Sequence, residues 1–255
     1  MYRELLDLTD RVAVVTGGSR GIGEAIALAL SEFGAKVVLS SRKIEGLNAV
    51  KEKIEAQGGQ AHCIPAHMGD LDSLQAVVDG TLEAFGTIDI LINNAATNPI
   101  FGPVTEAEEA AWDKIMDVNL KGIFFLTKSA GKVMLEKGKG AIVNISTEAA
   151  VRPALLLSVY SISKAGVDMA TKTFAQEWGS QGIRVNGIAP GLVQTKFSQA
   201  LWANKGILQQ ALSRVPLGRM AQPTEIAGLA VFLVSDAASF ITGQTVLVDG
   251  GSMLL

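Results

Sequence analysis

The sequence contains few of the residues on which disulfides and transition-metal sites depend. Its 255 residues include one cysteine and two histidines. A single cysteine, Cys63, excludes an internal disulfide and is typical of a reducing compartment. So few thiol and imidazole groups also argue against a dedicated transition-metal site, and we expect no metal.

Concentrated charge and long apolar runs are also missing. The net charge is −3, and the basic residues are scattered rather than gathered into the footprint of a nucleic-acid binder. No apolar run is long enough to cross a bilayer, and the first residues, MYRELLDLTDR, lack the apolar core of a signal peptide. We therefore expect a soluble cytoplasmic protein with neither a nucleic acid nor a membrane as partner.

Short apolar segments alternate with longer helical patterns along the whole chain. Strands buried on both faces of a parallel sheet have this composition, and the alternation is typical of a doubly wound α/β fold. The strand candidates are RVAVVT, AKVVLS, AHCIPA, IDILIN, GAIVNIS, IRVNGIA and QTVLVD. The helical patterns cover about 21–33, 44–57, 71–85, 106–136, 159–179 and 223–234. We predict one Rossmann-type domain over residues 1–255, with about seven parallel strands and helices on both faces.

One stretch, at about 195–215, departs from this alternation. It has a helical pattern and carries Phe197, Leu201 and Trp202 late in the chain. Two interpretations remain open: a lid over the substrate, or an ordinary packed excursion.

The turn after the first predicted strand is rich in glycine. TGGSRGIG places Gly17, Gly21 and Gly23 between that strand and the first helix. Glycine permits a tight turn and close approach of the backbone to a ligand, and a helix N-terminus presents free N–H groups to phosphate. The spacing is G-x-x-x-G-x-G, not the commoner G-x-G-x-x-G. Its position at the first strand–helix junction favours a dinucleotide site over a plain tight turn.

The end of the second predicted strand bears on which dinucleotide binds. NAD-binding proteins usually carry a carboxylate about 20 residues after the glycine turn. Here the strand ends VVLSSRK, so Ser41 and Arg42 stand there and the first acid is Glu45. Arg42 can hold a 2′-phosphate through two parallel hydrogen bonds, and Arg20 is a second candidate. The alternative is that Arg42 and Lys43 are solvated at a strand end; the sequence favours NADP(H).

Further motifs follow in order: NNAA at 93–96, DVNLKG with Asn119, a Y-x-x-x-K formed by Tyr160 and Lys164, PGLVQT at 190–195, and ITGQTVLVDGG near the end. With the glycine turn, they resemble the short-chain dehydrogenase/reductase family over nearly the whole chain. SSRK, NPIFG and LW most resemble its NADPH-dependent carbonyl reductase and retinal reductase branch, of the dehydrogenase/reductase member 4 type.

The resemblance implies which residues hold the cofactor: Gly17, Ser19, Arg20, Gly21, Ile22, Gly23, Ser41, Arg42, His67, Met68, Asn94, Ala95, Tyr160, Lys164, Pro190, Gly191, Val193 and Thr195. Two positions depart from the family pattern. Ala96 replaces the last glycine of N-N-A-G, and His67 replaces an aspartate that often contacts the adenine. His67 is therefore interpreted either as a cofactor contact, with Met68 offering its backbone, or as a packed loop residue.

Tyr160 and Lys164 are four residues apart, so on a helix they share a face. A free tyrosine, with a pKa of about 10, is a weak acid near pH 7. An ammonium about 5 Å away at an effective dielectric of about 20 stabilises the phenolate by roughly 3 kcal/mol, which desolvation opposes. We expect Lys164 to lower the pKa of Tyr160, the acid–base residue. The resemblance adds that Lys164 bonds the nicotinamide ribose and that Asn119 helps hold a water between this lysine and solvent.

The family's remaining catalytic residue is a serine that bonds the substrate oxygen, usually thirteen residues before the tyrosine. That spacing leads to Thr147. A threonine hydroxyl can donate and accept as a serine does, although its methyl stiffens the side chain. Ser146 takes the role instead if the loop 148–158 is one residue longer than usual.

The predicted substrate wall is largely apolar, which suits a hydrophobic ketone or aldehyde better than an anion. It comprises Asn98, Phe101, Leu155, Leu156, Leu157, Phe197 and Trp202. The alternative for the leucines is a subunit contact. Family members are commonly tetramers, with the last strand and segments 106–136 and 159–179 in their interfaces, so we expect a homotetramer.

Three functions follow from these features. The leading hypothesis is an NADPH-dependent reductase of apolar ketones, aldehydes or α-dicarbonyls. The nearest alternative is a 3-oxoacyl-thioester reductase, which would need a basic surface, such as Lys128 and Lys132, for an acidic carrier protein. An alternative from another class is a nucleotide-sensing module that binds the cofactor without turnover.

Overall fold

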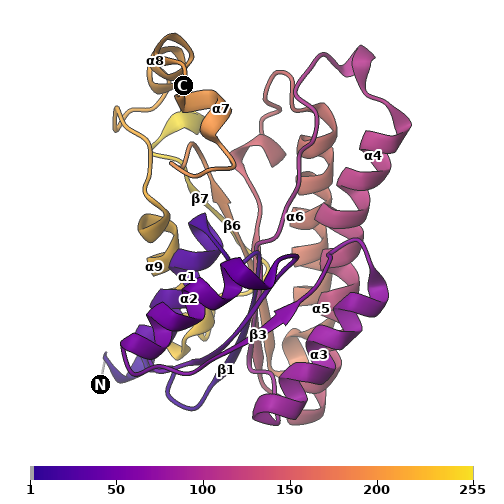
Figure 1. Ribbon diagram of the computed structural model, residues 1–255, viewed down its shortest axis with the longest axis vertical. Helices are drawn as coiled ribbons and strands as arrows, with labels where there is room; N and C mark the ends of the chain where they lie inside the picture. The colour runs from indigo at the N-terminus through magenta and orange to yellow at the C-terminus, as the bar shows by residue number, and fades with distance from the viewer. Residues whose placement is uncertain (1–2, 255) are drawn as a thin grey trace.

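A seven-stranded parallel sheet runs through the centre of the computed structural model, which describes residues 3–254 (Figure 1). The strand order is β3-β2-β1-β4-β5-β6-β7. Each predicted strand is confirmed to within two residues at its ends, and so is the doubly wound fold. The strands are β1 (Val12–Thr16), β2 (Lys36–Ser41), β3 (Ala61–Pro65), β4 (Ile90–Asn93), β5 (Gly140–Ile145), β6 (Ile183–Pro190) and β7 (Thr245–Val248).

Helices cover both faces of the sheet (Figure 1). One face carries α1 (Gly21–Glu32), α2 (Ile44–Ala56) and α9 (Pro223–Val234). The other carries α3 (Leu71–Phe85), α4 (Glu109–Met116), α5 (Gly122–Lys137) and α6 (Ser158–Trp178). None of the helices within residues 3–254 is long and apolar enough to cross a membrane.

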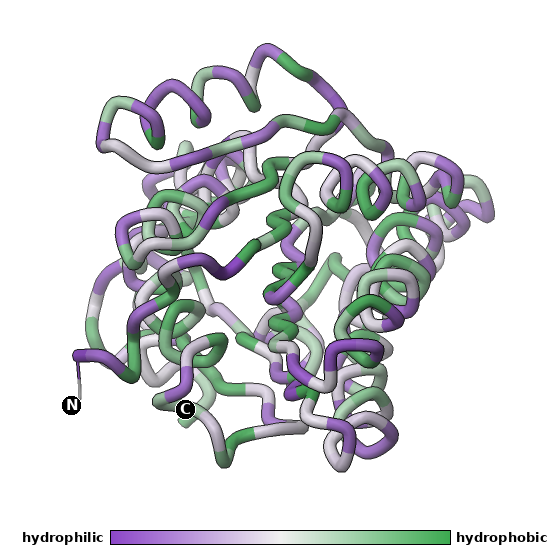
Figure 2. Tube along the Cα trace, turned by 90° about the horizontal axis from the view of Figure 1, so that it is seen from below, coloured by the Kyte–Doolittle hydropathy of each residue, from purple (hydrophilic) through white to green (hydrophobic). Residues whose placement is uncertain are grey.

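The strands are apolar throughout because helices cover them on both sides. Every residue of β1 and β4 is buried. In Figure 2, stretches with much green cross the middle of the molecule between coils of mixed green and purple on either side. Alternating side chains divide the core in two. Val15 and Val143 pack toward α1 and α9, whereas Val14 and Ile142 pack toward α3, α5 and α6.

The segment predicted as one helix over 106–136 is interrupted. A 3-10 turn at Val104–Glu106 precedes α4, and a π turn at Asp117–Lys121 joins α4 to α5. In that turn the N–H of Gly122 bonds the carbonyl of Asp117, five residues back. Gly122 lies against the loop after β3, where a Cβ would come within 2.0 Å of the Met68 carbonyl oxygen. The π turn lets the helix pass this loop, and such turns frequently occur at functional sites.

The predicted helical excursion after β6 forms two short helices, α7 (Gln199–Trp202) and α8 (Lys205–Leu212). They lie at the upper end of the molecule in Figure 1. The side chains of Ser198 and Trp202 bond the carbonyls of Val193 and Thr195 respectively, the latter at 3.0 Å. These bonds attach the excursion to the loop that leaves β6.

The contact between α5 and α6 gives a stability prediction. The backbone of Gly131 packs directly against the buried indole of Trp178, and a Cβ on Gly131 would come within 2.4 Å of the ring. We expect Gly131→Ala to destabilise the protein by about 1–3 kcal/mol through overpacking, more than the ~1 kcal/mol that alanine gains in a helix. Calorimetry should show the melting temperature falling by about 2–4 °C for each kcal/mol.

The matched control is Gly228→Ala in α9, where nothing lies within 4 Å of the added carbon. This variant should melt slightly above the wild type because only the helix propensity changes. Equal stability of the two variants would contradict the packing argument.

Candidate active site

The predicted site residues come from loops at the carboxyl ends of the strands and from the start of α6. This end of the sheet includes the gap between β1 and β4, where the strand order reverses. In open α/β sheets ligands bind in the crevice outside the carboxyl ends, at such a reversal.

The glycine turn is held by backbone geometry and by one amide side chain. Gly17 and Gly21 have φ values of 65° and 61°, a region that favours glycine. A Cβ on Gly23 would come within 2.3 Å of the Gly17 carbonyl oxygen. The side chain of Asn94 donates to the carbonyls of Thr16 at 3.0 Å and Gly17 at 3.2 Å. Asn94 of the NNAA motif, directly after β4, therefore stabilises the glycine turn that follows β1.

The N-terminus of α1 is open to a ligand. Arg20 is its N-cap residue, and the Arg20 side chain makes no capping hydrogen bond. The first N–H groups of the helix, from Gly21 to Gly23, are therefore left for an anion. A Cβ on Gly21 would lie 3.3 Å from the Thr195 side chain, so PGLVQT reaches the same place. Ser19 and Ile22 are partly buried beside them. This cradle fits the pyrophosphate of a dinucleotide.

The predicted 2′-phosphate site is positively charged and open. Arg42 and Arg20 are exposed, and Ser41 is partly buried, with its hydroxyl donating to the Lys43 carbonyl at 3.4 Å. Nothing in these positions obstructs a phosphate group, and the arginine forks suit one.

His67 closes the turn after β3. Its Nδ1 accepts the N–H of Gly69 at 3.1 Å, while its side chain is exposed and the neighbouring Met68 is buried. This bond supports the interpretation of His67 as a turn residue. Its contact with a cofactor stays a prediction.

Asn119 joins the loop after NNAA to the start of α6. Its amide accepts from the Thr97 N–H at 2.8 Å and donates to the Thr97 carbonyl at 2.9 Å and to the Ser163 hydroxyl at 3.2 Å. Ser163 in turn donates to the Tyr160 carbonyl at 2.7 Å. Asn119 is fully buried in the π turn. Its side chain thus acts as a brace in this structure, and its link to Lys164 through water stays a prediction.

Lys164 is buried beneath Tyr160. The residue is 1% exposed, and its Nζ donates to the Ile145 carbonyl at the end of β5 at 2.7 Å. Its Nζ lies 6.0 Å from the centroid of the Tyr160 ring. Burial lowers the pKa of Lys164 to about 8, and the charge of Asp168 opposes this shift.

The expected direction of the Tyr160 pKa shift is wrong for this structure. Burial raises the pKa of Tyr160 to about 12, although the residue keeps partial exposure. The Lys164 ammonium faces the Tyr160 ring and bonds a backbone carbonyl. On another side, the ring of Phe197 lies 6.0 Å from that of Tyr160, tilted by 40°. Desolvation therefore exceeds the attraction of the ammonium, and the tyrosine is protonated at neutral pH.

Thr147 and Ser146 face different surroundings. Ser146 is 4% exposed and its hydroxyl faces the Asp168 carboxylate, although the geometry does not complete a hydrogen bond. Thr147 is partly exposed; its Oγ1 accepts the Ala149 N–H at 3.3 Å and lies 3.5 Å from the Pro190 carbonyl oxygen. The Thr147 hydroxyl thus lies beside the PGLVQT loop, whereas that of Ser146 points into the protein. This arrangement supports Thr147 as the residue that bonds the substrate.

The predicted substrate wall forms an exposed apolar rim. Leu155 is 90% exposed, and the Gly102 N–H bonds the Leu156 carbonyl at 3.2 Å, which joins the loops after β4 and β5. Phe101 and Phe197 are also exposed, and the Phe197 ring packs beside the Tyr160 ring. The remaining members are partly buried: Asn98, Leu157 and Trp202. The wall is assembled from three separate segments, as a substrate site usually is.

The C-terminal segment, which the sequence reasoning missed, reaches the loop that carries Thr147. The Ser252 hydroxyl bonds Glu148 and lies 3.2 Å from an oxygen of Asp249, and Arg152 donates to the Ser252 carbonyl at 2.9 Å. Burial raises the pKa of Glu148, while its bond from Ser252 opposes the shift. The sequence shows an acid, Glu148, directly after Thr147, but the hydroxyl that binds it, on Ser252, lies about a hundred residues away.

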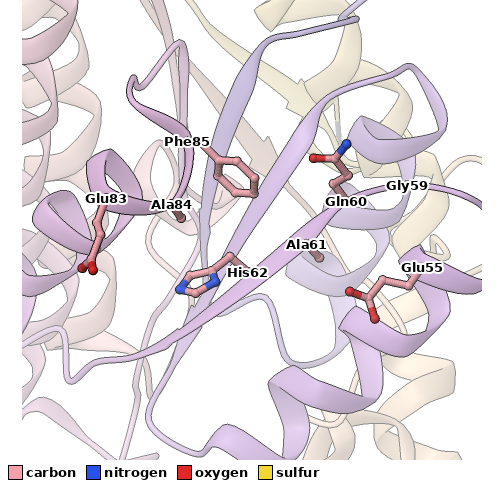
Figure 3. Close-up of a pocket in the computed structure, with 9 residues that line it drawn as sticks. Glu55, Gly59, Gln60, Ala61, His62, Glu83, Ala84 and Phe85 are labelled. Atoms are coloured by element: carbon pink, nitrogen blue, oxygen red, sulfur yellow. The ribbon is translucent and has the colours of Figure 1, made fainter.

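A separate hollow of about 610 Å³ lies between the ends of α2 and α3 and the start of β3 (Figure 3). Glu55, Gln60, His62, Glu83 and Phe85 line it among others. The start of β3 is at the amino end of the sheet, opposite Tyr160 and Lys164. The hollow is therefore no part of this site.

Comparisons with known proteins agree with this geometry. A family model described as Enoyl-(Acyl carrier protein) reductase matches residues 17–253. Dehydrogenase/reductase SDR family member 4 of Oryctolagus cuniculus is 40% identical over 96% of this chain and 94% of its own length. The 3-oxoacyl-[acyl-carrier-protein] reductase of a Synechocystis strain is 40% identical over 97% and 98%.

A solved structure also superimposes closely. The gluconate 5-dehydrogenase of Burkholderia cenocepacia, in complex with NADP and tartrate, has a TM-score of 0.96 and 32% identity, with all of both chains covered. The fold, the order of the motifs and these likenesses agree, and the chain belongs to the short-chain dehydrogenase/reductase family, whose members are oxidoreductases.

Proposed function

We propose that the protein is an NADP(H)-dependent reductase of apolar ketones, aldehydes or α-dicarbonyls. The observation that carries this proposal is the buried Lys164, bonded to the end of β5 beneath Tyr160, at the foot of an apolar rim. A lysine held there has no packing role that a leucine would not fill better, because burying an ammonium costs free energy.

The residues divide the work of reduction among them. A bound nicotinamide cofactor supplies the hydride. Tyr160 donates its hydroxyl proton to the oxygen of the carbonyl as charge develops there, and the Thr147 hydroxyl donates to the same oxygen. The Lys164 ammonium stabilises the phenolate that Tyr160 leaves behind, and Asn119 braces the start of α6. Because Tyr160 is protonated at neutral pH, reduction starts from the correct protonation state.

NADP(H) is supported by the chain's own charges. Arg20 and Arg42 are exposed and free to bind a 2′-phosphate, and Ser41 occupies the position at which NAD-binding proteins usually carry an acid. The Burkholderia structure was obtained with NADP. Within the cradle, Asn94, Ala95, Pro190, Gly191 and Val193 complete the proposed cofactor contacts.

The substrate class follows from the rim. Leu155, Phe101 and Phe197 expose apolar surface, and the Phe197 ring lies beside that of Tyr160. Such surface suits a hydrophobic carbonyl compound better than a sugar acid. We propose that α7 and α8 act as the lid over this substrate, because Phe197, whose ring packs beside that of Tyr160, precedes them in the chain.

A 3-oxoacyl-thioester reductase is the second candidate, favoured by the cyanobacterial relative and by exposed Lys128 and Lys132 on α5. Removing both lysines should weaken reduction of a carrier-linked substrate and leave reduction of a free ketone unaffected if this candidate holds.

We also propose a homotetramer, because Trp112, Phe124 and Phe125 expose aromatic surface on α4 and α5. The cytoplasmic location stays a prediction.

Tyr160→Phe tests the function directly. The change keeps the ring against Phe197 and removes only the proton, so NADPH should bind as in the wild type. Turnover of a panel of apolar ketones, followed by NADPH absorbance, should fall by about 10²–10⁴-fold. A variant that reduces a good ketone at the wild-type rate would disprove the mechanism, and a wild type idle with every ketone would favour the nucleotide-sensing module.

Thr147 is tested against its neighbour. Thr147→Ser should keep most activity, whereas Thr147→Val keeps the shape, loses the hydroxyl and should remove most of the turnover. Ser146→Ala is the matched control and should be milder, since its hydroxyl faces Asp168. Steady-state kcat with one ketone measures all three, and the opposite order of damage would assign the role to Ser146.

Cofactor choice is tested with Ser41→Asp combined with Arg42→Leu. The new carboxylate repels a 2′-phosphate and the lost guanidinium no longer binds it, so the ratio of kcat/KM for NADPH over NADH should fall at least tenfold. Lys139→Leu, which removes an exposed charge just before β5 at the opposite end of the sheet, should leave the ratio unchanged. A wild type that prefers NADH would refute the assignment.

A further inference from the structure

A carboxylate lies beneath the catalytic lysine. Asp168 follows Lys164 by one turn of α6, on the side of the helix that packs on the sheet. Its Oδ1 accepts from the Thr245 hydroxyl of β7 at 3.4 Å, and the Ser146 hydroxyl faces it from the end of β5. Asp168 therefore sits where α6 meets two strands, and not at the substrate rim.

This position costs free energy for a carboxylate. Burial raises the pKa of Asp168, and the charges of Lys164 and Lys172 on its own helix oppose that shift. The Thr245 hydroxyl lies close to Gly187 of β6, where any side chain would collide with it, since a Cβ there would come within 2.6 Å of the hydroxyl. The two hydroxyls and the two ammonium groups are the polar groups that face the acid from α6, β7 and the end of β5.

The lysine needs this charge because its own partner is neutral. Its Nζ bonds the carbonyl of Ile145, which fixes the ammonium but does not offset its charge. Asp168 is the group whose charge holds the pKa of Lys164 up against burial. In a medium of low dielectric such an interaction acts across several ångströms without direct contact.

We propose that Asp168 is a positioning residue for the reaction: its charge keeps the buried Lys164 protonated at the pH at which the enzyme works. This inference rests on the proposed function, because it assigns Asp168 a part in the same site. The sequence alone offers only an acid four residues after a lysine, a spacing typical of exposed helix pairs.

The proposal fixes a direction of pH dependence. A lysine loses its charge as pH rises through its pKa, and Lys164 titrates at about 8 with Asp168 in place. Removing the acid lets burial act unopposed, so the charge is lost at a lower pH. Reduction, which needs the ammonium beneath the phenolate, should then decline at a lower pH as well.

The direct test is the titration of Lys164 itself, by NMR of protein carrying ¹³C at the lysine Cε. The signal is assigned by its loss in Lys164→Met. In Asp168→Asn, which keeps size and a bond to Thr245, the midpoint should move to lower pH by at least half a unit. Lys172→Met, which removes the other ammonium near the acid, is the control and should leave the midpoint close to that of the wild type.

Asp168→Ser is the second variant, in case the asparagine protein does not fold, and Asp168→Glu should restore the wild-type midpoint. The descending limb of kcat against pH for ketone reduction should move with the NMR midpoint. An unchanged midpoint in a folded variant overturns the inference, even if the melting temperature falls. A wild type that reduces no carbonyl compound overturns the proposed function instead, and the titration still reports on Asp168.

Discussion

The buried ammonium of Lys164 is the constraint on which the site depends. A cation inside an α/β core must find a polar partner, and the end of β5 provides one in the Ile145 carbonyl. That bond ties α6 to the end of β5 one turn after Tyr160. Ser163 then links the same turn to Asn119, which holds the loop after β4. The loop after β4 and the start of α6 are thus joined by side-chain hydrogen bonds.

The fold could be predicted because each of its strands carries its own signal. β1 and β4 are buried on both faces, so their apolar runs are unbroken and end where the turn residues begin. The glycine turn and the Tyr160–Lys164 spacing were also readable, since each depends on residues that are close in sequence. The interruption of the long helix was not, because it depends on contact between Gly122 and the distant Met68 carbonyl.

The electrostatics of the site were harder to predict than its members. Residue spacing shows that Tyr160 and Lys164 share a helix face, but not that Phe197 packs beside the ring or that the ammonium bonds a carbonyl. Burial of Tyr160 reverses the expected direction of its pKa shift, and this burial is made by segments far apart in the sequence. Likewise, Ser252 donates to Glu148 and accepts from Arg152, so these bonds join segments about a hundred residues apart, a relation that no local pattern contains.

The attachment of α7 also has an experimental use. Trp202 bonds the Thr195 carbonyl, a few residues from the ring that packs beside Tyr160, while Trp112 is on α4 and Trp178 at the end of α6. The chain has three tryptophans, one on each of three different helices. Protein grown with fluorotryptophan would therefore give three fluorine resonances. One of them belongs to the segment beside the Tyr160 ring, so its line shape would report the motion of that segment in solution without any change to the sequence.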